Sequence, residues 1–202
     1  MEFSNNHFHN LFASRCKALV EEFSEQLGAP KQPAPPRTER WIPPSEGWYK
    51  VNVNRTVFKE SGSCGIGIVI RNERGEIIGA MSKRMDLSLG ALEVEAKAFK
   101  EGMLLARDLG MKHIVQEGDV QGVIDALMGC SSPPTSIQMI IEGIQRQIWK
   151  ARYVRRTIIM AAHLMARNAK FVNDSVIWVE DIPPIIEYQV TKDVFVSDHG
   201  PV

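Results

Sequence analysis

The chain reads Trp48-Tyr-Lys-Val-Asn-Val-Asn54 where its first apolar strand is expected, with Asn54 at the end of that strand. Two more strands are expected over residues 64–71 and 76–83, and Cys64-Gly-Ile-Gly-Ile-Val-Ile70 has the β-branched enrichment of a central strand. The connection Asn72-Glu-Arg-Gly75 provides a glycine for a positive-φ turn position. Three consecutive strands joined by hairpins pair antiparallel.

The second half of the chain alternates helical and strand patterns. A long helix is expected over residues 89–109, followed by strand 112–118, helices 120–128 and 136–149, strand 151–158 and helix 160–170. Strands that follow crossover helices pair in parallel. The sequence therefore predicts an α/β fold: a mixed five-stranded sheet, three strands antiparallel and two parallel, flanked by helices.

The ends of the chain differ in composition from its centre. Residues 1–28 are expected to form an amphipathic helix, because Phe8, Phe12, Leu19, Phe23 and Leu27 recur at helical spacing. The apolar face of this helix needs a partner, either the main domain or another protein. Residues 29–45 are expected to be a proline-rich linker, residues 46–172 the main domain, and residues 173–202 a C-terminal extension.

Composition excludes some functional classes. Lys+Arg and Asp+Glu both number 24, so any surface that binds phosphates must be local. Three widely spaced cysteines indicate reduced thiols. The absence of a signal-peptide pattern and of a membrane-spanning apolar run predicts an intracellular protein, cytoplasmic or nuclear, without a membrane partner.

Two carboxylates stand out in this pattern. Glu95 lies on the inner stripe of the long helix, where burial is costly without a metal or hydrogen bonds, although a glutamate near a helix start also favours the helix dipole. Asp119 follows strand 112–118 directly and precedes a helix, so an N-cap role is the alternative to a role in a site.

Four positions, taken in order, resemble the ribonuclease H fold. They are Asn54, Glu95, Asp119 and His163. Between about residues 41 and 179 the chain is similar to the plant ribonuclease-H-like domain related to retroelement enzymes. This resemblance implies Asp, Glu, Asp and Asp at the four positions, two bound Mg²⁺ ions, and cleavage of the RNA strand of an RNA–DNA hybrid.

The motifs around the first and last positions depart from that family. Asn54 and Arg55 stand where the family has an aspartate and a small residue, and His163 stands where the last aspartate is expected, although some relatives carry histidine there. Val154, Arg156 and Ala162 match the family's last motif.

These substitutions change the expected metal chemistry. An amide adds no negative charge, and Arg55 adds a positive one, so Mg²⁺ should bind weakly or not at all at Glu95 and Asp119. Imidazole suits zinc, but one histidine with two carboxylates is no recognisable zinc signature, and a surface or capping role is expected for His163.

A basic cluster consists of Arg152, Arg155 and Arg156, beside Lys150. It predicts contacts with phosphate oxygens of a nucleic acid. The equally weighted alternative is a solvated strand edge that its charges protect from pairing.

Three functions follow from these features. The first is a ribonuclease-H-like domain that binds RNA–DNA hybrid or structured RNA without cleaving it. The second is an active Mg²⁺-dependent hybrid ribonuclease. The third is a protein–protein adaptor on a decayed ribonuclease H fold, which would use the N-terminal helix.

Overall fold

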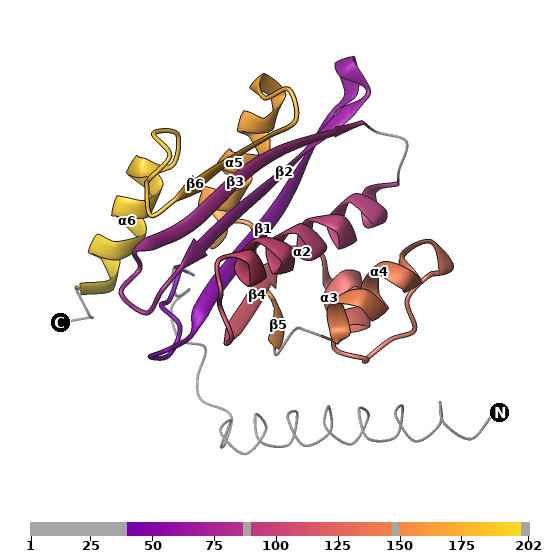
Figure 1. The fold of residues 1–202 in the computed structure, drawn as a ribbon, viewed down its shortest axis with the longest axis horizontal. Coiled ribbons are helices and arrows are strands. Elements are labelled where there is room, and N and C mark those ends of the chain that lie inside the picture. The colour runs from indigo at the N-terminus through magenta and orange to yellow at the C-terminus, as the bar shows by residue number, and fades with distance from the viewer. Residues whose placement is uncertain (1–39, 87–89, 147–149, 199–202) are drawn as a thin grey trace, which may run out of the picture.

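The structure, a computed structural model, describes residues 40–86, 90–146 and 150–198 (Figure 1). The helix predicted for residues 1–28 and most of the linker predicted for residues 29–45 lie outside these ranges. Within them, no helix is long and apolar enough to span a membrane.

The described strands form one mixed sheet in the order β5-β4-β1-β2-β3-β6. Their bounds are β1 (Tyr49–Phe58), β2 (Ser63–Arg71), β3 (Ile77–Asp86), β4 (Ile114–Gly118), β5 (Lys150–Tyr153) and β6 (Ser175–Val179). The pairs β1–β4 and β4–β5 are parallel, and the pairs β1–β2, β2–β3 and β3–β6 are antiparallel. The predicted α/β class and the mixed sheet are confirmed.

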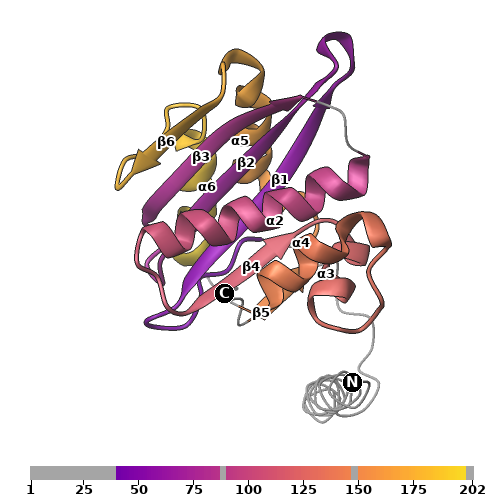
Figure 2. The same ribbon diagram turned by 45° about the vertical axis from the view of Figure 1, so that its right-hand side comes forward.

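Helices cover both faces of this sheet (Figures 1 and 2). On one face lie α2 (Ala91–Asp108), α3 (Gln121–Leu127) and α4 (Thr135–Gln145). On the other lie α5 (Met160–Asn168) and α6 (Glu187–Asp198). Two short 3₁₀ helices, η1 (Lys59–Ser61) and η2 (Ala169–Phe171), follow β1 and α5.

The predicted count of five strands is wrong, because β6 adds a sixth at the β3 edge. Its sequence, Ser-Val-Ile-Trp-Val, shows no alternation of polar and apolar residues, so a local pattern does not mark it as a strand. The predicted domain range 46–172 stops short of both β6 and α6, which pack on the sheet.

Two strand boundaries also differ from the prediction. Strand β1 continues to Phe58, so Asn54 lies inside the strand rather than at its end. Strand β5 ends at Tyr153, so residues 154–158 belong to the loop before α5 rather than to a strand. By contrast, Gly75 has the predicted positive φ of 78° in the β2–β3 turn.

The residues of β1 alternate between the two faces of the sheet, as side chains in any strand do. Val51 and Val53 contact α2, which comes so near that a Cβ on Gly102 would lie 2.8 Å from Val53 Cγ1. Asn52 and Asn54 point to the opposite face and are fully buried there. The strand thus places amides on the face that α5 covers.

Helix α5 packs directly against the backbone of β2. A Cβ at Gly65 would collide with the carbonyl oxygen of Ala166, and one at Gly67 with that of Ala162. Only glycine leaves room for this approach, and the helix contributes alanines to the contact. The close packing fixes how far the side chains of α5 reach across β1 and β2.

A buried charge network connects the sheet to both flanking segments. The guanidinium of Arg71 is fully buried, lies 2.8 Å from Asp193 of α6 and donates to Asn52 Oδ1 at 3.1 Å. It stacks on the Trp41 ring at 3.9 Å, and the Trp41 indole also donates to Asn52 Oδ1. Asn52 in turn donates to Glu117 of β4 at 2.9 Å.

We expect Gly67→Ala to lower the free energy of unfolding by about 1–3 kcal/mol, because the added methyl group forces α5 away from β2. Urea unfolding followed by circular dichroism measures the change. The control is Gly122→Ala in α3, where an added Cβ meets nothing within 4 Å and should be neutral or slightly stabilising. Equal stability of the two variants would contradict the close contact.

Candidate active site

The sheet and two helices bring the four predicted positions to one end of the β1–β4 pair. Asn52 of β1 pairs with Glu117 of β4, and two residues further along each chain come Asn54 and Asp119. Glu95 enters from α2, near enough to Asp119 for that charge to raise the pKa of Glu95, and His163 enters from α5. The elements predicted to carry the site therefore converge.

The two substituted positions contact each other. The Nδ1 atom of His163 lies 3.1 Å from Oδ1 of Asn54, so the ring donates this hydrogen bond when Nδ1 carries the proton. Burial, followed by the charges of Arg156 and Arg167, lowers the pKa of His163, with Asp119 opposing them. The imidazole of His163 is therefore neutral and lies half-buried against the amide of Asn54. The prediction of a surface or capping histidine is wrong.

Glu95 is fully buried and faces an arginine of its own chain. Nε of Arg55 lies 3.2 Å from Oε2 of Glu95, but the two atoms are not aligned as a hydrogen bond. Neither carboxylate oxygen has a hydrogen-bond partner among the described residues. Burial, followed by the charge of Asp119, raises the pKa of Glu95 to about 7 in spite of Arg55 and Arg156. The carboxyl is therefore poorly stabilised as an anion.

Asp119 is paired as well. Arg156, from the loop before α5, donates from Nε to Oδ2 of Asp119 at 2.7 Å. The N-cap alternative for Asp119 is wrong, because Val120 occupies the N-cap of α3 and no side chain caps that helix. A charge-assisted contact of this length is stronger than a neutral hydrogen bond, although Arg156 itself is more than half exposed.

The basic cluster divides between two locations. Arg152 lies on β5, the outermost strand on its side of the sheet, and Lys150 of the same strand lies over the Trp48 ring. Arg155 and Arg156 lie in the loop that leads to α5, beside the four-position site. Arg152 thus fits the interpretation of a solvated strand edge. Arg155 and Arg156 are placed where they could contact phosphates of a nucleic acid.

These residues do not fit a site for two Mg²⁺ ions. Two such ions carry four positive charges, while the site offers at most two carboxylate charges, which Arg55 and Arg156 already offset. The first and last positions add only a neutral amide and an imidazole, and the amide oxygen is engaged by His163. Across the described ranges, no group of three or more His, Cys, Asp or Glu side chains is arranged to hold a metal.

Sequence reasoning missed the specific partners of the two carboxylates. Arg55 was expected to weaken metal binding, but its ion pair with Glu95 depends on how α2 crosses β1. Arg156 was expected to meet phosphates, whereas it pairs with Asp119, which lies 37 residues earlier. A cation next to a site position is the only local signal, and it does not identify the partner.

Comparisons with known proteins agree with this fold. A sequence model of the reverse transcriptase-like family matches residues 52–169, more than half of the chain, and the chain belongs to that family. A search of curated proteins finds no match.

Three solved structures share the ribonuclease H fold with this chain. Ribonuclease H1 from the halophilic archaeon Halobacterium salinarum is 18% identical with a TM-score of 0.56, and the match covers 61% of this chain and 98% of that one. LC11 ribonuclease H1, isolated from compost, is 14% identical with a TM-score of 0.54, covering 61% and 95%. The N-terminal ribonuclease H domain of a Mycobacterium tuberculosis protein, solved as a fusion with maltose-binding protein, is 14% identical with a TM-score of 0.53, covering 60% and 92%.

We expect the buried carboxyl of Glu95 to make stability pH-dependent. Because its folded pKa is about 7 against an ordinary 4.5, folding favours the protonated form, and stability falls as the pH rises from about 4.5 through 7. Glu95→Gln should remove a loss of about 2.5 kcal/mol between pH 5 and pH 8, measured by urea unfolding at both values.

The matched control is Glu142→Gln, an exposed acid of α4 whose replacement keeps Glu95 and should therefore retain the loss of stability between pH 5 and pH 8. Parallel profiles of the Glu95→Gln variant and the unmodified protein would contradict the raised pKa.

Proposed function

We propose that this chain is a ribonuclease-H-like nucleic-acid-binding domain whose degenerate site does not cleave RNA–DNA hybrid. The observation that carries the proposal is that each retained carboxylate faces an arginine of its own chain, Glu95 facing Arg55 and Asp119 facing Arg156. Phosphodiester hydrolysis by two metals needs negatively charged oxygens that converge on the ions. Here arginines of the chain itself take up that charge.

The binding half of the proposal rests on the cations beside the site. Arg155 and Arg156 are exposed neighbours in the loop before α5, and Arg156 contacts Asp119, so both guanidinium groups can meet phosphate oxygens of a strand that crosses the site. RNA–DNA hybrid or structured RNA is the ligand class that the family resemblance implies. Plant origin, a relation to retroelements and an intracellular location remain predictions from the sequence.

An active Mg²⁺-dependent nuclease is the second candidate. The buried Glu95, whose oxygens lack hydrogen-bond partners among the described residues, is the feature that favours it, since an orphaned carboxylate can receive a cation. Adaptor function through residues 1–28 stays a prediction, because that segment lies outside the described residues.

We expect no Mg²⁺ binding by the unmodified protein in isothermal titration calorimetry, because its site carries no net negative charge. A triple variant, Asn54→Asp with Arg55→Gly and His163→Asp, should gain Mg²⁺ binding, since it restores two carboxylates and removes one cation. Cleavage of a labelled RNA–DNA hybrid with Mg²⁺ or Mn²⁺ is measured in parallel. Turnover by the unmodified protein that Glu95→Gln abolishes would overturn the proposed inactivity.

We expect the double variant Arg155→Ala, Arg156→Ala to bind hybrid more weakly, with a salt dependence reduced by about two in slope if both residues meet phosphates. Fluorescence anisotropy at several salt concentrations measures this change. Asp119→Asn is the matched control, because it weakens the Arg156 pair but keeps both cations, and its affinity should not fall. Equal affinity of the double variant would exclude these arginines from the interface.

A further inference from the structure

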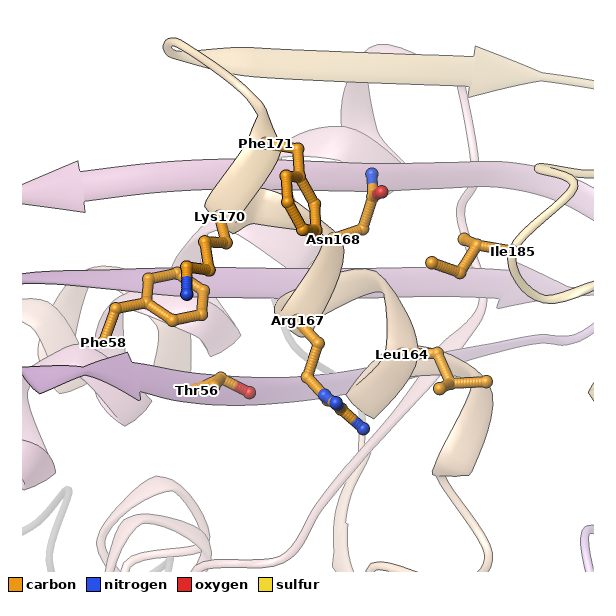
Figure 3. A pocket seen from close by; sticks show the side chains of 8 residues that line it. All are labelled: Thr56, Phe58, Leu164, Arg167, Asn168, Lys170, Phe171 and Ile185. Atoms are coloured by element: carbon orange, nitrogen blue, oxygen red, sulfur yellow. The ribbon is translucent and has the colours of Figure 1, made fainter. Parts of the chain in front are cut away.

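A hollow of about 500 Å³ lies beyond the four-position site, between the end of β1, helix α5 and η2 (Figure 3). The side chains that matter for its chemistry are those of Thr56, Phe58, Arg167, Lys170 and Phe171. They combine aromatic rings, cations and a hydroxyl in one place. No role in the proposed site accounts for them.

The aromatic component is unusual for a surface that binds nothing. Phe171 is 82% exposed, and Phe58, from the end of β1, borders the same hollow (Figure 3). A large ring left in water adds nothing to stability, but it offers a flat face on which a planar group can stack. Stacking on exposed rings is how sequence-tolerant single-strand binders hold nucleobases.

The hollow is also positively charged. Arg167 is exposed and forms no ion pair with any residue in the described part of the chain. Lys170 has one acidic neighbour, Glu60 at 3.8 Å, and because Glu60 is 92% exposed that pair is weak. The hydroxyl of Thr56 is buried without a hydrogen-bond partner among the described residues, so a polar donor or acceptor is still free there.

Helix α5 connects this hollow to the four-position site. His163, Arg167 and Lys170 are spaced by four and three residues, which places them on one side of α5 and its continuation into η2. Arg156 and Arg167 both lower the pKa of His163, so both charges lie near that residue. Cationic side chains therefore extend from Arg156, which contacts Asp119, to Arg167 and Lys170 beside the aromatic rings.

We infer that the hollow binds a nucleobase of a single strand that extends from nucleic acid held at the four-position site, with Phe171 as the stacking face and Arg167 as a phosphate contact. The inference rests on the proposed nucleic-acid binding and names a second subsite for it. Rings together with exposed cations favour a base attached to phosphate over an acidic peptide, which would use the cations alone.

The test compares a blunt RNA–DNA hybrid with hybrids that carry a single-stranded extension of about eight nucleotides on the RNA or the DNA strand. Fluorescence anisotropy should show about tenfold tighter binding of one extended hybrid by the unmodified protein. Phe171→Ala should abolish this gain and leave blunt-hybrid affinity unchanged. Arg167→Ala should reduce the salt slope by about one for the extended hybrid only.

The matched control is Tyr188→Ala, which removes an aromatic ring of α6 that is 80% exposed and does not line the hollow. This variant should retain the full gain. Because Phe171 is equally exposed, its substitution is not expected to unfold the domain, and far-ultraviolet circular dichroism checks that point.

The possible failures separate the two proposals. Blunt-hybrid binding with no gain from either extension overturns the subsite and leaves the proposed function standing. A gain that survives Phe171→Ala and is competed away by polyglutamate also overturns the subsite, because charge alone then explains it. Binding of a free single strand that depends on Phe171, without blunt-hybrid binding, supports the subsite and overturns hybrid binding. Binding of no nucleic acid overturns both.

Discussion

Packing on the sheet face that α5 and α6 cover depends on the interactions of the buried Arg71 guanidinium. A fully buried cation is tolerated only when opposite charge and hydrogen bonds surround it, and here Asp193, Asn52 and the Trp41 ring provide them. These partners come from a helix near the C-terminal end, a central strand and a segment before β1. The cation therefore ties both flanking segments to the sheet, because Asp193 provides its opposite charge and Trp41 covers its face.

The same sheet face also determines the geometry of the candidate site. Helix α5 can lie against β2 only because Gly65 and Gly67 carry no side chain, and this approach brings His163 to Asn54. Across the sheet, α2 approaches β1 closely and places Glu95 beside Arg55. Close packing on both faces thus assembles the four positions. The two carboxylates among them face Arg55 and Arg156, whereas a pair of divalent ions requires an excess of negative charge.

The surface around the four positions carries exposed cations and an exposed aromatic ring. Arg155 and Arg156 are exposed in the loop before α5, and Arg167 lines the hollow together with the exposed ring of Phe171. A surface that carries exposed cations and aromatic rings can bind phosphates and bases, whereas a carboxylate cluster binds metal ions.

The sequence by itself determined the α/β class and the succession of β1 to α5, because strand alternation, helical periodicity and turn residues are local properties. The four positions of the candidate site were predicted from the resemblance to the ribonuclease H family. Only the tertiary structure decided that β6 completes the sheet, that Asn54 lies inside β1, and that Arg156 pairs with Asp119. The His163–Asn54 contact spans 109 residues and the Arg156–Asp119 contact spans 37. Contacts over such separations depend on strand register and on how closely helices pack, and no local pattern encodes either.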